Sequence, residues 1–88
     1  METRLDELRR EIDRIDDEVC ALFIKRMALV SDIAEYKREN NLPVLNKSRE
    51  DEILERLTDG LNDKMAGYIK TFFTAIFNLS KDFQESGV

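Results

Sequence analysis

Apolar residues recur at alternating steps of three and four positions from Leu5 to Tyr36. This spacing places them on one face of a long helix, in the heptad pattern of a helix that packs against partner helices. The positions are Leu5, Leu8, Ile12, Ile15, Val19, Leu22, Leu29, Ile33 and Tyr36. The segment Asn40–Pro43 predicts the end of this helix, because Asn accepts a left-handed backbone conformation and Pro cannot continue a helix.

Two shorter helices are predicted after the proline. One begins near Ser48, whose hydroxyl can cap it, and ends at Asp59–Gly60; the other is capped by Asn62 or Asp63. The inward apolar positions are Ile53, Leu54 and Leu57 in the first, and Met65, Ile69, Phe72, Phe73, Ile76, Phe77 and Phe83 in the second. No segment has the alternating pattern of a strand. The predicted fold class is therefore all-α, with one three-helix domain over residues 1–88.

The predicted first helix is too long for one compact subunit. A helix of about 35 residues is roughly 50 Å long, whereas a compact chain of this size has a diameter of about 30 Å. The helix must therefore extend past its own subunit, and its apolar face is exposed there unless a second chain covers it. The expected assembly is an intertwined helical homodimer with paired first helices.

The composition favours a globular protein that neither lies in a membrane nor binds nucleic acid. Charged residues make up 38% of the chain and hydrophobic residues 42%, which is too apolar for a disordered segment and too charged for a membrane protein. The net charge of −5 provides no general positive field for phosphates. Residues 1–7 lack the apolar stretch of a signal peptide, so the expected location is the cytoplasm.

The chain has one cysteine and no histidine. The chain therefore lacks the residues that zinc sites, haem sites and Ser-His or Cys-His catalysis usually need, and no metal is expected. Cys20 lies within the apolar helical pattern, where a buried small hydrophobic residue is the favoured interpretation and a reactive thiol the alternative.

Arg26 occupies the heptad position after Leu22, where an apolar residue is expected. A buried arginine is costly unless an anion meets it. The alternatives to an anion site are a buried salt bridge with a helix acid and a polar residue that sets the helix register. Lys37 projects within about 20° of Arg26 around the helix, although cations at this spacing are commonly solvated. Arg9 lies about 25 Å from Arg26 along the axis, so only an antiparallel partner chain could bring an Arg9 to the Arg26–Lys37 segment.

The apolar stripe of the last helix continues from Phe77 through Ser80 and Gln84 at four-residue steps. Fraying toward solvent near the end of the helix is one explanation. Together with Arg26, however, these two hydrogen-bonding side chains predict a polar pocket inside a helical bundle.

Four segments of the chain resemble the all-α chorismate mutases, in the same order and at the same separations. They are Leu8–Asp16, Lys25–Arg26 with Tyr36–Lys37, Pro43–Glu50 and Ile76–Gln84. Each motif is short, but together they cover nearly the whole chain. The resemblance implies an enzyme without cofactor or metal that converts chorismate, a dicarboxylate enol-pyruvyl ether, into prephenate by a Claisen rearrangement.

The resemblance also implies roles for individual residues. Arg9 from the partner chain and Arg26 would hold the two carboxylates of the substrate. Lys37 and Gln84 would donate to the ether oxygen, where negative charge develops as the C–O bond breaks. Positioning and fixed donors suffice for such a reaction, which needs no nucleophile.

The remaining implied contacts come from the Pro43–Glu50 segment and the last helix. Arg49 and Ser80 would complete the carboxylate and wall contacts, and Glu50 would accept from the ring hydroxyl. Asn46 stands where many family members carry Asp, so its contact is either through its backbone or lost. Two alternatives stay open: an isochorismate-pyruvate lyase of the same fold, and a non-catalytic helical dimerisation module.

Overall fold

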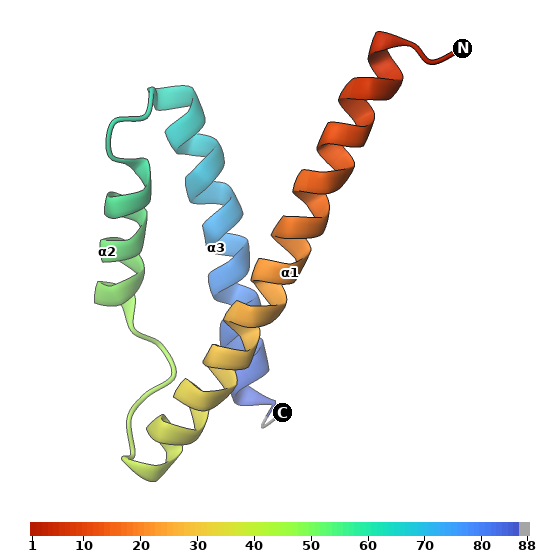
Figure 1. The fold of residues 1–88 in the computed structure, drawn as a ribbon. Coiled ribbons are helices and arrows are strands. Elements are labelled where there is room, and N and C mark those ends of the chain that lie inside the picture. Colours follow the sequence, from red (N-terminus) through yellow and green to blue (C-terminus); the bar gives the residue numbers. More distant parts are fainter. Residues whose placement is uncertain (87–88) are drawn as a thin grey trace.

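The computed structural model of the chain describes residues 1–86 (Figure 1). It consists of three α-helices, α1 (Arg4–Glu39), α2 (Lys47–Thr58) and α3 (Asp63–Glu85). No strand occurs in this part of the chain, and the predicted all-α fold of three helices is confirmed. The predicted domain, residues 1–88, ends on two residues that lie outside the described part.

Local hydrogen bonds set both ends of α1. The Thr3 hydroxyl accepts from the Asp6 N–H (3.1 Å) while the Asp6 carboxylate accepts from the Thr3 N–H (3.2 Å), which makes a capping box. At the other end, Asn41 has a left-handed backbone (φ 54°), and the Leu42 N–H donates to the Lys37 carbonyl at 2.8 Å. This is the Schellman arrangement, and it confirms the predicted end of the first helix.

The caps of α2 and α3 are both asparagines. Asn62 accepts from the N–H of Met65 (2.8 Å), as one of the two predicted caps of α3. Asn46, however, caps α2 by accepting from the Arg49 N–H (3.0 Å), so the prediction that Ser48 caps this helix is wrong. A cap residue needs a non-helical backbone, and because Asn46 comes first along the chain, the helix has already begun at Ser48.

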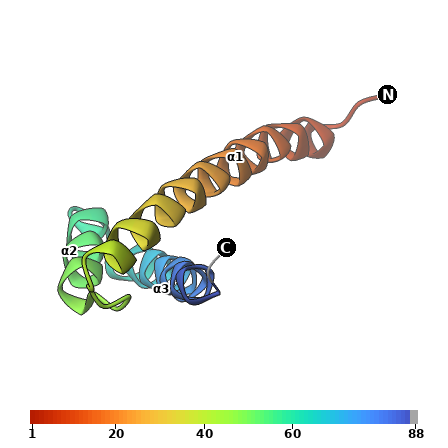
Figure 2. The ribbon, with the colours of Figure 1, turned by 90° about the horizontal axis from the view of Figure 1, so that it is seen from below.

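α2 and α3 form an antiparallel hairpin, and α1 crosses α3 so that its first half points away from the hairpin (Figures 1 and 2). A small core of Val30, Ala34, Ile53, Ile76 and Phe77 lies where the helices meet. The radius of gyration is 16.8 Å and the longest dimension 59 Å, compared with about 12 Å for the radius of a compact chain of this length. The expected overhang of the first helix is therefore confirmed.

The overhanging part of α1 is uncovered by its own chain. Every residue from 1 to 22 is exposed, including Cys20. The interpretation of Cys20 as buried is therefore wrong within the single chain, because Cys20 lines an open groove between α1 and α3 that α3 does not close. None of the helices in the described part has the length and apolar character needed to cross a membrane.

Candidate active site

A cavity of about 360 Å³ lies between the second half of α1, the start of α2 and the end of α3. Its volume is within the range of small-molecule sites. Seven of the eight predicted site residues line it: Arg26, Lys37, Asn46, Arg49, Glu50, Ser80 and Gln84. Its apolar wall consists of Leu29, Val30, Ile33, Val44, Ile53 and Phe77. Residues from all three helices are thus brought together at one place.

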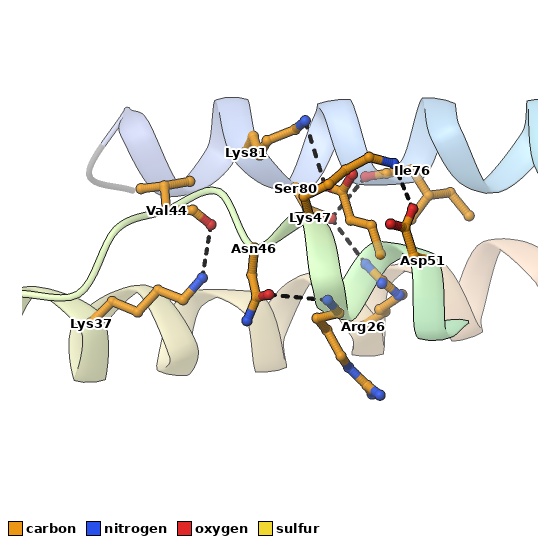
Figure 3. Close-up of polar contacts among 11 residues, drawn as sticks. Arg26, Lys37, Val44, Asn46, Lys47, Asp51, Ile76, Ser80 and Lys81 are labelled. Atoms are coloured by element: carbon orange, nitrogen blue, oxygen red, sulfur yellow. Dashed lines mark hydrogen bonds and ion pairs between the residues drawn. The ribbon is translucent and has the colours of Figure 1, made fainter. Parts of the chain in front are cut away.

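Arg26 is half-buried and fixed against α3 (Figure 3). Its guanidinium donates to the Ser80 hydroxyl at 2.9 Å and lies 5.8 Å from the centre of the Phe77 ring. Burial lowers the pKa of Arg26 below its ordinary value, and the positive charge of Arg49 lowers it further. Arg26 makes no ion pair with a carboxylate in the described part of the chain. The alternative of an intrachain salt bridge with a helix acid is therefore wrong.

Ser80 links α1 to α3 and is itself buried. Its hydroxyl accepts from Arg26 and donates to the Ile76 carbonyl at 2.8 Å. Gln84, one turn later, is half-buried. The proposed fraying of the helix toward solvent at these two positions is therefore wrong.

The side-chain amide of Gln84 has hydrogen-bonding capacity that the described residues leave unused. Its Oε1 is buried and has no hydrogen-bond partner among the described residues. A buried polar group without a partner costs about 1–3 kcal/mol, which a suitable ligand would offset. A half-turn about the last side-chain bond exchanges the oxygen and the NH₂ group, so this amide can present a donor to the cavity as well as an acceptor.

Lys37 reaches from α1 to the segment before α2. Its ammonium group donates to the Val44 carbonyl at 2.8 Å (Figure 3), and the side chain is half-buried rather than solvated. An ammonium group has three N–H donors. Two therefore remain for a ligand in the cavity.

The start of α2 contributes Asn46, Arg49 and Glu50. The side-chain oxygen of Asn46, Oδ1, accepts the capping hydrogen bond from the Arg49 N–H, a role that an Asp side chain fills equally well. Arg49 pairs with Glu52 at 2.6 Å on the exposed side of the helix. Glu50 instead pairs with Lys81 of α3, with 3.5 Å between Nζ and Oε2.

The charge balance of the cavity is opposite to that of the chain. In the described part of the chain four cationic side chains line it, those of Arg26, Lys37, Arg49 and Lys81, against the single carboxylate of Glu50. The chain as a whole carries a net charge of −5. A cluster of cations beside an apolar wall can bind an organic anion with both charged and hydrocarbon parts. No group of carboxylates, thiols or histidines within residues 1–86 is arranged to hold a metal ion.

Residues 8–85 match the profile of the family described as chorismate mutase type II. The chain belongs to this family. A solved structure of a chorismate mutase (form II) from Thermus thermophilus has a TM-score of 0.88 and 33% sequence identity, over 94% of this chain and 96% of that one. The chorismate mutase fold thus extends over almost the whole of the described part.

Part of the chain is also similar to two curated proteins. A bifunctional chorismate mutase/prephenate dehydratase of Aquifex aeolicus is 47% identical over 53 residues, which are 60% of this chain and 15% of that protein. A chorismate mutase of Methanocaldococcus jannaschii is 35% identical over 54 residues, 61% of this chain and 54% of that one. The chain thus spans well under two thirds of the length of these relatives.

The charged and polar residues that line the cavity differ from the predicted site residues at two positions. Arg9 lies on the exposed half of α1 and is not among the residues that line the cavity. Lys81 lines the cavity and was not predicted. A signal for it exists in the sequence, because Lys81 follows Ser80 directly and precedes Gln84 by one turn, but a lysine near the end of a charged helix is usually solvated.

Proposed function

We propose that the chain is a chorismate mutase, which converts chorismate into prephenate in phenylalanine and tyrosine biosynthesis. One observation carries the proposal: four cations and a buried, unpartnered amide converge on an apolar-walled cavity. Such a cavity suits a dicarboxylate with a hydrocarbon ring. The single, unpaired Cys20 fits a reducing compartment, and we place the enzyme in the cytoplasm.

The proposed mechanism is positioning combined with fixed charge. In the rearrangement an ether C–O bond breaks as a C–C bond forms, and no atom or proton is gained or lost. Arg26 binds a substrate carboxylate with the N–H groups that its bond to Ser80 leaves free. Lys37 and Gln84 donate to the ether oxygen as negative charge develops on it, which stabilises the transition state over the ground state.

The residues at the start of α2 complete the binding site. Arg49 turns from Glu52 toward a carboxylate, which costs little because an exposed ion pair contributes at most about 1 kcal/mol. Glu50 accepts a hydrogen bond from the ring hydroxyl, and Ser80 forms part of the wall. Asn46 keeps the cap of α2 in place, and its backbone faces the substrate.

We further propose an intertwined homodimer in which Arg9 of each chain completes the cavity of the other. The exposed apolar face of α1 supports a dimer, and the distance of about 25 Å between Arg9 and Arg26 along the helix excludes joint binding of one small molecule within a chain. The test is to mix and refold two inactive variants, Arg9→Ala and Arg26→Ala. Half of the dimers formed are heterodimers with one intact site, so about a quarter of the wild-type activity should return.

Refolding each variant alone is the control and should restore nothing. If Arg9 instead acted within its own chain, heterodimers would contain no intact site. No recovery in confirmed heterodimers would therefore contradict the shared site.

The activity itself is tested by incubating the purified chain with chorismate and following the loss of its ultraviolet diene absorbance, with prephenate identified as the product. The Arg26→Ala variant is the control for contaminating activity. Pyruvate release from isochorismate without turnover of chorismate would instead identify a lyase. If neither compound were turned over, the remaining interpretation would be a non-catalytic helical dimerisation module.

A further inference from the structure

The ion pair between Lys81 and Glu50 differs from the other ion pairs of the described residues. It joins α3 to α2, and its side chains are only 29% and 19% exposed. In the other four pairs every side chain is at least 41% exposed, and both partners lie in one helix or at the start of the chain. The Lys81–Glu50 pair is therefore the one between elements, and both of its members line the cavity.

The negative charge of Glu50 weakens the binding of an anion in this cavity unless a nearby cation offsets it. Among residues 1–86 Glu50 is the only carboxylate that lines the cavity, and a free carboxylate would repel a dianionic ligand. The ammonium group of Lys81, 3.5 Å from Glu50 Oε2, offsets this charge. Because a half-buried pair is screened less by solvent than a surface pair, this compensation is stronger than that of the exposed pairs.

The pair also restricts where the Glu50 carboxylate can lie. Lys81 belongs to the turn of α3 between Ser80 and Gln84, so an ion pair with it draws the Glu50 carboxylate toward α3. A carboxylate that moved toward Arg26 or Arg49 would compete with the substrate for that arginine. Holding Glu50 at the wall leaves both guanidinium groups available.

We propose that Lys81 is a positioning residue of the chorismate mutase site, which acts through Glu50 and keeps its carboxylate from repelling the substrate or pairing with the substrate-binding arginines. This inference rests on the proposed function. Lys81 itself makes no contact with the reacting atoms. Its effect is on substrate binding rather than on the chemical step.

The test is a double-mutant cycle with Lys81→Met and Glu50→Gln in the 88-residue chain. We expect Lys81→Met alone to lower kcat/KM about tenfold, mainly through a higher KM, as for coupled neighbours. In the Glu50→Gln background the same substitution should change kcat/KM less than about twofold, because the charge that Lys81 offsets is gone. Lys81→Arg should restore most of the activity.

Lys47→Met is the matched control, because Lys47 also pairs with an acid, Asp51 at 2.5 Å, but on the exposed face of α2 outside the cavity. It should leave the kinetics unchanged. Circular dichroism and sedimentation establish that each variant is folded and assembled; Lys81→Gln replaces Lys81→Met if the latter is not.

Three results would overturn the proposal alone, in an active wild-type chain: an unchanged kcat/KM in Lys81→Met, an equal loss in the Glu50→Gln background, or a loss confined to kcat. A wild-type chain that does not turn over chorismate would overturn the proposed function and this proposal with it.

Discussion

The two halves of α1 have the same heptad pattern but different surroundings. In residues 4–22 every side chain is exposed, apolar ones included, whereas in residues 23–39 the helix packs on α3 and buries Val30 and Ala34. The second half also carries Arg26 and Lys37 into the cavity. A single chain therefore encloses most of the site and leaves the other half of its longest helix without a partner.

The same heptad pattern thus has a different structural role in each half of α1. Most of the apolar face of residues 4–22 points away from the α2–α3 hairpin (Figures 1 and 2), and Val19 only lines an open groove opposite Phe72 and Leu79 of α3. A large exposed apolar surface on a small protein marks an interaction site. The second half instead carries polar residues that the same chain partners: Arg26 donates to Ser80 of α3, and Lys37 donates to the Val44 carbonyl in the segment before α2.

The largest expected effect comes from charging the first half of α1. Ile15 is 57% exposed in the single chain, where Ile15→Lys would be a neutral surface change of within about 0.5 kcal/mol. In the proposed dimer it buries a charge in both copies, which costs several kcal/mol each. We expect Ile15→Lys to abolish the dimer and the activity at micromolar concentration, measured by sedimentation and chorismate turnover.

Asp17→Asn is the control for this substitution. It adds the same unit of charge, but nearly opposite the apolar face at 100° per residue, and should leave assembly intact. A folded, active Ile15→Lys chain would contradict the dimer.

The next largest effect is expected at Gln84, in the half of the molecule that builds the site. Gln84→Ala removes a donor to the developing oxyanion and should lower kcat by about 10²–10³ at every pH. Gln84→Glu places a group with an ordinary pKa of about 4.3 there, and only its protonated form can donate. Its activity should therefore be highest in acid and fall as pH rises through that pKa, whereas the wild-type amide does not titrate.

The measurement is kcat against pH from about 5 to 8, a range in which an ordinary glutamate is largely ionised. Full activity of Gln84→Glu at pH 8 would mean that Gln84 does not face the ether oxygen.

The smallest effect is expected at the cap of α2. Asn46→Ala removes the acceptor for the Arg49 N–H and should cost about 1 kcal/mol of stability, seen as a melting temperature a few degrees lower at fixed protein concentration. Asn46→Asp keeps the acceptor and should melt close to the wild type. Ser48→Ala is the matched control, since Ser48 lies inside the helix. An equal loss of stability in Ser48→Ala would mean that Ser48, and not Asn46, caps α2.

Much of the fold was determined by the sequence, because its signals are local. The three helices, the stop at Asn41 and the cap at Asn62 follow from periodicity and from side chains within a turn of the backbone they bond. The overhang follows from length alone. The Ser48 cap failed for a local reason too: two capping residues stand two positions apart, and propensity does not choose between them.

The tertiary structure decided which residues that are distant in the sequence contact one another. Arg26 meets Ser80, 54 positions away, rather than an acid on its own helix, and Lys81 turns to Glu50 rather than to solvent. Helical periodicity states which face a side chain occupies but not which residue of another helix it meets. That choice depends on how α1 crosses α3 and how far α2 slides along it, because a shift of one turn, about 5.4 Å, would exchange every partner in the cavity.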